Sequence, residues 1–533
     1  MHLKLPKLPA ANAIATNALK LMLVLWVMLA VAAVFVMTLG TDEAWVLNGL
    51  RSALRPQVPN LSTDLIVTSG GPFALANLAV EQLAGSQVWL HRLVSLLCLG
   101  LCFALVTKGR ISKVAPDSIK WLMLAPLIAI PGAAVVGTAA LGTSTGLFLM
   151  VAAMVTWTTP GASLAKRVLA GGLLYGLAAA SRFDLVLFGP AVLLASCLRV
   201  TSSGRLEVRL NLPAWVFVII GAGVFLLNLW AMSLPANALL AGSIGAPTGL
   251  TSWSLNYPKL LNDWQTVTTF APLSLLVLMA VSAFWFTPAP KETTYPHIPR
   301  FESLLLITGL VLLTGWLLRS PIPHLRYAFP ALFCFAALGG IGLHRLATRS
   351  LANGAGWHVL LCQCIGLAFV IGSIGTTARS LVMSDSDYAS WEWSHEMSYD
   401  YFRHFEARQD QAKVTDILRN ELFSDARIYS YVPYALRYLT ERPIIAVDRS
   451  PQPDRAVYHT NRYLVLTPAV GTYFYMNPNT ANWIQANAKL VKQIGRYSVY
   501  QLPAGNDEDL ENMKLHRTNY VRHPGSIAWF GHR

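Results

Sequence analysis

Long apolar segments separated by short polar loops are the feature that most constrains how this chain can fold. Eleven of them lack Lys, Arg, Asp and Glu, and with their flanking residues they approach the roughly 20 residues that a helix needs to cross a bilayer. Only 13% of the 533 residues are charged, whereas about 25% is usual in soluble globular proteins. The sequence therefore predicts a polytopic α-helical membrane protein with about 11 transmembrane helices. The predicted spans are residues 21–38, 93–106, 121–139, 143–158, 168–180, 185–198, 212–232, 268–286, 303–318, 329–343 and 357–377.

Basic residues are unevenly distributed along the chain. The net charge of +14 lies wholly in residues 1–383, which contain 24 Lys and Arg against 10 Asp and Glu, while residues 384–533 contain 17 of each. With the N-terminus in the cytoplasm, the inner loops carry 16 basic and 4 acidic residues, and the outer loops carry 8 and 6. This bias follows the positive-inside rule and explains the basic charge without a nucleic-acid partner. We expect a bacterial inner-membrane protein with a cytoplasmic N-terminus and, because the span number is odd, a periplasmic C-terminal region.

The predicted spans divide the chain into two parts. Residues 1–383 contain all of them and include two long outer loops, 40–91 and 233–267. Two helix-like stretches in the first loop, 43–54 and 73–83, are expected to lie along the membrane surface. Residues 384–533 differ in character, because strand-like and helix-like stretches alternate there, which predicts an extracytoplasmic α/β domain. The strand-like stretches are 425–432, 462–467 and 496–502, and the helix-like ones are 434–440 and 482–494.

Ionisable residues gather where the predicted spans reach the outer side, and such residues are costly near a membrane unless they serve a function. Asp42 and Glu43 follow the first span, and adjacent carboxylates suit a general base or a metal site. Taken alone, a solvated helix start with Thr41 or Asp42 as its cap is the favoured explanation. His91 and Arg92 begin the second span, where a cation suits a phosphate or a carboxylate. Taken alone, snorkelling toward lipid headgroups is the favoured explanation. Arg182 lies in a short turn with Asp184, so an ion pair within the turn competes with a phosphate-binding role.

A second basic group precedes the tenth predicted span. Arg319, His324 and Arg326 lie in one proline-stiffened outer segment, and together they could bind an anion. Few ionisable residues fall inside the spans, which argues against an ion pathway. No nucleotide-binding or hydrolase motif accompanies these residues. An enzyme acting at the outer face lacks a nucleotide supply, so we expect a substrate already activated in the membrane, such as a lipid-linked phosphate.

Three short motifs resemble those of the GT-C superfamily of polytopic glycosyltransferases, in particular the branch with the protein O-mannosyltransferases and the lipid A aminoarabinose transferase. Asp42-Glu43-Ala44-Trp45 is similar to the Asp-Glu motif after their first span. Arg92-Leu93-Val94-Ser95 is similar to their Arg-Leu-Pro-Ser, and Arg326-Tyr327-Ala328-Phe329-Pro330 to their Arg-Tyr-x-x-Pro. There are two departures: Gly70-Gly71-Pro72-Phe73 stands where many relatives have Pro-Pro-Leu, and Arg182 where some have Lys.

The resemblance implies a GT-C-like catalytic domain over residues 1–383. It also implies an inverting transfer of a sugar from a polyprenyl-phosphate donor to an acceptor hydroxyl. Asp42 would be the general base, and Glu43 would orient the acceptor or, with Asp42, hold a divalent metal if one is used. The residues implied in binding the donor phosphate are Arg92, Arg182, His324, Arg326 and Tyr327. The acceptor stays open between protein, lipid and glycan.

Two other functions compete with a glycosyltransferase. A flippase or transporter of lipid-linked glycans is expected to show an internal repeat and polar groups at mid-membrane, and the sequence has neither. An O-antigen ligase or polymerase would place its essential Arg and His in a large late loop, whereas the loop at 319–325 is short.

Overall fold

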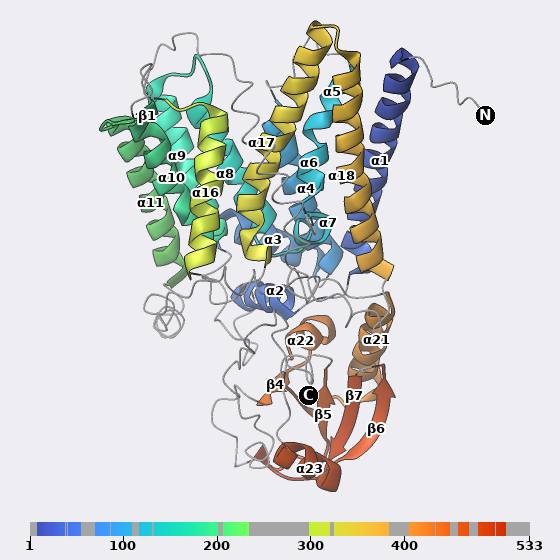
Figure 1. Cartoon of the computed structure of the whole chain (residues 1–533). Helices are drawn as coiled ribbons and strands as arrows, with labels where there is room; N and C mark the ends of the chain where they lie inside the picture. Colours follow the sequence, from blue (N-terminus) through green and yellow to red (C-terminus); the bar gives the residue numbers. More distant parts are fainter. Residues whose placement is uncertain are drawn as a thin grey trace, which may run out of the picture.

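The apolar helices stand side by side in the computed structural model of the chain, and a segment of helices and strands lies beyond one end of them (Figure 1). Within the described part, five helices are long and apolar enough to cross a membrane. They are α1 (Leu8–Val36), α4 (Val88–Thr107), α11 (Leu212–Ser233), α17 (Leu325–Ala352) and α18 (Gly356–Val382). The structure describes residues 8–37, 39, 41–54, 70–85, 87–108, 117–130, 133–200, 206–233, 298–319, 325–382, 405–431, 433–447, 457–467, 478–495 and 497–507.

Shorter apolar helices complete the described part of the bundle. They are α8 (Thr143–Thr158), α9 (Leu164–Ser181), α10 (Phe188–Cys197), which follows the 3₁₀ turn η2 (Phe183–Leu187), and α16 (Phe301–Arg319). A small hairpin of β1 (Leu198–Val200) and β2 (Leu206–Val208) connects α10 to α11. The helices thus account for most predicted spans, whereas the span at 268–286 and the loop at 233–267 lie outside the described residues. The count of eleven stays a prediction.

One predicted span is wrong as a continuous helix. Residues 121–139 instead form short turns, namely η1 (Trp121–Met123), α6 (Ala125–Ile128) and α7 (Ala133–Val136), after the single turn α5 (Asp117–Lys120). The described residues of the segment are mostly apolar and buried, but Pro126 opens α6, and the sequence has a second proline, Pro131, between α6 and α7. Proline lacks the amide hydrogen and clashes with the preceding turn, so it interrupts a helix even where hydropathy favours one.

Helices α9 and α11 approach closely through small residues. A Cβ atom added to Gly176 would lie 2.5 Å from the Gly221 carbonyl oxygen, and one added to Gly172 would lie 2.8 Å from the Phe217 carbonyl oxygen. Tyr175 from α9 stacks on Phe217 with 5.8 Å between ring centroids. Close packing across small residues is how membrane helices associate without a hydrophobic driving force between them.

Two helices, α2 (Thr41–Leu54) and α3 (Gly71–Ala84), lie at the end of the bundle that adjoins the C-terminal strands (Figure 1). They confirm the helices expected at 43–54 and 73–83. The start of α3 explains the Gly-Gly departure from the family motif. Gly71 has φ +55°, and a Cβ atom there would lie 2.8 Å from the Cβ atom of Ala180. The Gly70 amide also donates to the Ala180 carbonyl oxygen at 3.0 Å. Glycine therefore allows α3 to begin directly against the end of α9.

The C-terminal segment contains a five-stranded mixed sheet in the order β4-β3-β5-β7-β6. The strands β3, β4 and β5 are parallel, whereas β7 is antiparallel to both β5 and β6. Apolar side chains are buried on both faces of the sheet. The strands are β3 (Arg427–Ser430), β4 (Ile444–Ala446), β5 (Arg462–Leu466), β6 (Lys489–Ile494) and β7 (Tyr497–Leu502). The helices are α21 (Phe405–Asp416) with the π-helical turn η3 (Ile417–Glu421), α22 (Tyr434–Thr440) and α23 (Pro478–Asn487).

Most local predictions for this segment agree with the structure. The expected strands at 425–432, 462–467 and 496–502 contain β3, β5 and β7, and the expected helix at 434–440 is α22. The helix expected over 482–494 is wrong in its second half, because α23 ends at Asn487 and β6 occupies Lys489–Ile494. Gly495 has φ +52° and turns the chain back on itself, so pairing with β7 overrides the helical pattern.

Candidate functional site

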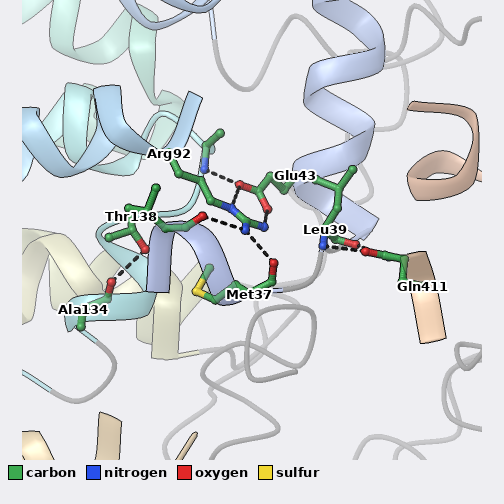
Figure 2. Close-up of polar contacts among 9 residues, drawn as sticks. Met37, Leu39, Glu43, Arg92, Ala134, Thr138 and Gln411 are labelled. Atoms are coloured by element: carbon green, nitrogen blue, oxygen red, sulfur yellow. Dashed lines mark hydrogen bonds and ion pairs between the residues drawn. The ribbon is translucent and has the colours of Figure 1, made fainter. Parts of the chain in front are cut away.

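The junction between α1 and α2 carries the Asp-Glu motif. Glu43 lies in the first turn of α2 and is completely buried. Arg92, near the start of α4, donates from Nε to Glu43 Oε1 at 2.9 Å and from Nη2 to Glu43 Oε2 at 2.6 Å (Figure 2). The Ala140 amide also donates to Glu43 Oε1 at 3.0 Å. A bidentate pair of this kind fixes direction as well as distance, so Glu43 anchors the first turn of α2 to two other segments.

Arg92 also holds the end of α1. Its Nη1 donates to the Met37 carbonyl oxygen at 2.8 Å and to that of Val34 at 3.4 Å. The last carbonyl groups of a helix have no partner within the helix and carry partial negative charge, which a buried guanidinium satisfies. Arg92 is only 2% exposed. It therefore bonds to the chain on both sides of Asp42, at Met37 after the end of α1 and at Glu43 in the first turn of α2.

The other motif residues are placed by their backbone or lie outside the described part. Asp42 directly precedes Glu43 in the first turn of α2, and Arg326 and Tyr327 lie in the first turn of α17. The side chains of these three residues and the whole of His324 lie outside the described residues. The helix α17 begins at the end of the bundle where α2 and α3 lie (Figure 1). The Asp-Glu motif and the Arg-Tyr motif are thus brought to the same end of the helices.

Arg182 adjoins this group from the end of α9. Its Nε donates to both carboxylate oxygens of Asp184, at 2.8 and 2.9 Å, and its Nη1 donates to Thr143 Oγ1. The pair within the turn, one of the two interpretations of Arg182, is therefore present. Asp184 is still about one-third exposed, so this charge is not sealed from solvent. Thr143 follows Ala140 closely, and the short turn 140–143 connects Arg182 to the Glu43 anchor.

No metal site emerges from the residues that the structure describes, since none of them form a group of three or more His, Cys, Asp or Glu side chains. Glu43, which the sequence suggests as a metal ligand, has its carboxylate oxygens occupied by Arg92 and the Ala140 amide. The side chain of Asp42, the other residue that the sequence suggests as a metal ligand, lies outside the described residues.

A buried polar cluster joins α2, α3 and α4 to α22, and the sequence predicted little of it. Arg51 Nε donates to Glu81 Oε1 at 2.6 Å, and its Nη1 donates to the Tyr438 carbonyl oxygen at 2.8 Å. The Tyr438 hydroxyl donates to Glu81 Oε2 at 2.6 Å and lies 3.1 Å from His91 Nε2. His91 Nδ1 lies 2.8 Å from Asn77 Oδ1. The guanidinium of Arg51 also stacks over the Tyr438 ring, 3.9 Å from its centroid.

The hydrogen bonds and charges of this cluster shift the pKa of Glu81. Burial alone would raise the pKa of Glu81, but hydrogen bonds from His91, Arg51 and Tyr438 and the charge of Arg51 lower it from 4.5 to about 2. The pKa of the Tyr438 hydroxyl is raised, first by burial and then by the adjacent Glu81 carboxylate. Glu81 is therefore ionised and Tyr438 neutral over the physiological range. A buried, hydrogen-bonded ion pair of this kind favours one docking arrangement between two parts of a chain. Of these residues, the sequence indicated only His91, which precedes Arg92 at the start of the second predicted span.

Comparison with known proteins places this arrangement in a known fold. No protein-family model matches the chain, and no curated protein matches it. Among solved structures, ArnT from Cupriavidus metallidurans in the apo state matches with a TM-score of 0.57 and 12% identity over 92% of this chain and 98% of that chain. The same protein bound to undecaprenyl phosphate matches with a TM-score of 0.54 and 13% identity, covering 91% and 98%. An oligosaccharyltransferase from Archaeoglobus fulgidus gives a TM-score of 0.42 at 14% identity, covering 85% and 70%.

The match to ArnT extends over nearly the whole of both chains, so it includes the apolar helices and at least part of the C-terminal segment. ArnT is the lipid A aminoarabinose transferase, a member of the branch that the Asp-Glu, Arg-Leu and Arg-Tyr motifs indicated. At such low identity the likeness establishes the fold. This chain is a multi-pass membrane protein with the fold of the GT-C transferase ArnT.

Proposed function

We propose that the chain is a glycosyltransferase that moves a sugar from a polyprenyl-phosphate donor to an acceptor hydroxyl, with inversion and with Asp42 as the general base. The observation that carries the proposal is the Asp-Glu turn held between α1 and α4 by Arg92 in a chain with the ArnT fold. The ArnT structure with undecaprenyl phosphate supports the choice of donor class.

The chemistry of the proposed transfer follows from charge. Asp42 accepts the proton of the acceptor hydroxyl as its oxygen attacks the sugar C1 atom from the face opposite the phosphate. The bond between C1 and the phosphate oxygen breaks, and its electron pair leaves with the polyprenyl phosphate. Negative charge thus develops on the phosphate oxygen, where cations aimed in advance lower the barrier. We assign this role to Arg182, His324 and Arg326, with Tyr327 as a further phosphate ligand.

Arg92 and Glu43 receive a supporting role in this proposal. Because each is buried and bound to the other, they hold the turn that presents Asp42 and do not need to contact the donor or the acceptor. No step requires a metal ion. We place the reaction at the outer face of the bacterial inner membrane, with the N-terminus cytoplasmic, eleven spans within residues 1–383, and residues 384–533 as a periplasmic α/β domain.

The test is an Asp42→Asn variant of the full chain in lipid nanodiscs, with Asp416→Asn, an exposed aspartate on α21, as the matched control. A panel of undecaprenyl-phosphate sugars is supplied with membrane extract as a source of acceptors, and released undecaprenyl phosphate is measured. General base catalysis contributes about 10²–10⁴-fold, so Asp42→Asn should lose at least 100-fold in turnover while binding undecaprenyl phosphate within about twofold of wild type. A fully active Asp42→Asn variant would overturn the proposal. In sealed proteoliposomes, movement of the intact donor across the bilayer without release of the phosphate would identify a flippase instead.

A further inference from the structure

Gln411 joins the C-terminal segment to the connection between α1 and α2. It lies on α21, and its side chain bonds the backbone of Leu39 twice (Figure 2). The Leu39 amide donates to Gln411 Oε1 at 3.1 Å, and Gln411 Nε2 donates to the Leu39 carbonyl oxygen at 3.1 Å. Both residues are buried. The side-chain amide thus forms the two hydrogen bonds that a neighbouring β-strand would form with the backbone of Leu39.

Leu39 lies between the two points that Arg92 holds. Met37 precedes it and accepts a hydrogen bond from Arg92, and Glu43 follows it and forms the ion pair with Arg92. Asp42 belongs to the same short stretch of chain. The connection is therefore held from two directions, by a membrane helix through Arg92 and by the C-terminal segment through Gln411.

The same segment also holds the later turns of α2. Asn48 Nδ2 donates to the Tyr434 carbonyl oxygen at 2.7 Å, and Arg51 Nη1 donates to that of Tyr438 at 2.8 Å. These carbonyl groups belong to α22, which packs along α2 (Figure 1). Contacts from α21 and α22 thus flank the first turn of α2, at Leu39 before it and at Asn48 and Arg51 after it.

We propose that Gln411 is a positioning residue for Asp42, and that the C-terminal segment is in this way a required part of the catalytic site. This inference rests on the proposed function. Without the amide of Gln411, the Leu39 N–H and C=O groups would be buried without partners, which is costly enough to make the connection move toward water. A displacement of about 1 Å at a catalytic group can lower turnover about 100-fold. The donor phosphate would still meet its own ligands, so its affinity would be preserved.

The experiment compares Gln411→Met with Gln493→Met in the full chain. Methionine keeps the length and volume of glutamine but cannot bond the peptide, and Gln493 is an exposed residue of β6 that bonds a backbone carbonyl, that of Gly495, at 2.8 Å. We expect Gln411→Met to lower kcat at least tenfold and to leave the donor KM and the affinity for undecaprenyl phosphate within twofold. Hydrogen exchange should become faster in residues 37–47 and stay unchanged in α9. Gln493→Met should match wild type in each measurement.

Three results would overturn the inference. The first is a kcat for Gln411→Met within twofold of wild type, and the second is an equal loss in kcat and donor affinity, which indicates general misfolding. If Gln411→Met does not fold, Gln411→Glu is measured in its place. Glutamate keeps the acceptor for the Leu39 amide, so this variant should fold with reduced kcat and normal donor affinity. A wild-type kcat for Gln411→Glu is the third contrary result. An active Asp42→Asn variant, in contrast, refutes the proposed function whatever the Gln411 variants do.

Discussion

The junction between α3 and α22 allows a quantitative prediction for Glu81→Gln. Glu81 is 5% exposed and accepts hydrogen bonds from Arg51 and from the Tyr438 hydroxyl, each at 2.6 Å. The substitution keeps the shape of the side chain but removes its charge. Arg51 then stays buried without its carboxylate, and the Tyr438 hydroxyl loses a charged acceptor.

The magnitude follows from the pKa of Glu81. It falls from 4.5 to about 2 in the folded chain, and each unit corresponds to about 1.4 kcal/mol, so the ionised form contributes about 3 kcal/mol to stability. Removing one partner of a buried ion pair typically costs about 3–5 kcal/mol, which agrees. Because the folded pKa is the lower one, this stability is fully present above pH 4.5 and is lost as the pH falls toward about 2.

The assay is thermal unfolding of the purified protein in detergent, followed by tryptophan fluorescence and by protease sensitivity of the C-terminal segment. About 3 kcal/mol corresponds to a decrease in Tm of roughly 6–12 °C if the cooperative unit has 150–250 residues. The matched control is Glu421→Gln, whose ion pair with Lys492 is about half exposed, with 3.2 Å between Nζ and Oε2, and exposed pairs contribute little. A Glu81→Gln variant that melts within about 1 °C of wild type at pH 7 would refute the reasoning. So would a difference from wild type that does not shrink between pH 5 and pH 2.

Three further predictions concern other ionisable groups. Arg92→Met leaves Glu43 as a buried carboxylate without its cation, so we expect the free energy of unfolding to fall by about 3–5 kcal/mol in thermal unfolding. The double variant with Glu43→Met should recover stability but not turnover, and recovered turnover would contradict the anchoring role. Arg182→Ala should weaken undecaprenyl-phosphate binding at least tenfold, about 1.4 kcal/mol, in a direct titration, and unchanged affinity would exclude Arg182 as a phosphate ligand. Burial, and then the hydrogen bond to Asp507, raise the pKa of Tyr429 from 10.0 to about 12. The stability of the fold should therefore fall as the pH rises from about 10 to 12. The difference between ultraviolet titrations of wild type and Tyr429→Phe should show that the Tyr429 hydroxyl ionises near pH 12 and not near pH 10.

The sequence predicted the features that depend on local pattern and on charge at span ends. Glu43, Arg92 and Arg182 stand out because an ionisable residue beside an apolar run is unusual, and the structure brings all three to one end of the bundle. The choice of partners was not predictable. The sequence leaves a phosphate, a carboxylate or lipid headgroups as partners of Arg92, and only packing shows that it pairs with Glu43 while its Nη1 donates to the α1 carbonyl groups.

Other features were missed because they depend on contacts between distant residues. Glu81 looks like an ordinary exposed residue of an amphipathic helix, and its partner Tyr438 lies 357 positions away. The same holds for Gln411 and Leu39, which are 372 positions apart. The hydropathy of residues 121–139 indicates that they are buried, but it does not reveal that Pro126 interrupts the helix. At 489–494, the pairing of β6 with β7 decides the structure, and no local pattern reports it.

The two-sided hold on the connection between α1 and α2 has a thermodynamic consequence. Ordering a residue costs about 1–2 kcal/mol in backbone entropy. Arg92 and Gln411 fix the backbone at Met37 and Leu39, so this cost is incurred when the chain folds and not when a substrate arrives. Binding of a polyprenyl phosphate should then bring little further ordering of this turn. In the proposed enzyme, this turn couples docking of the C-terminal segment to the reactivity of Asp42.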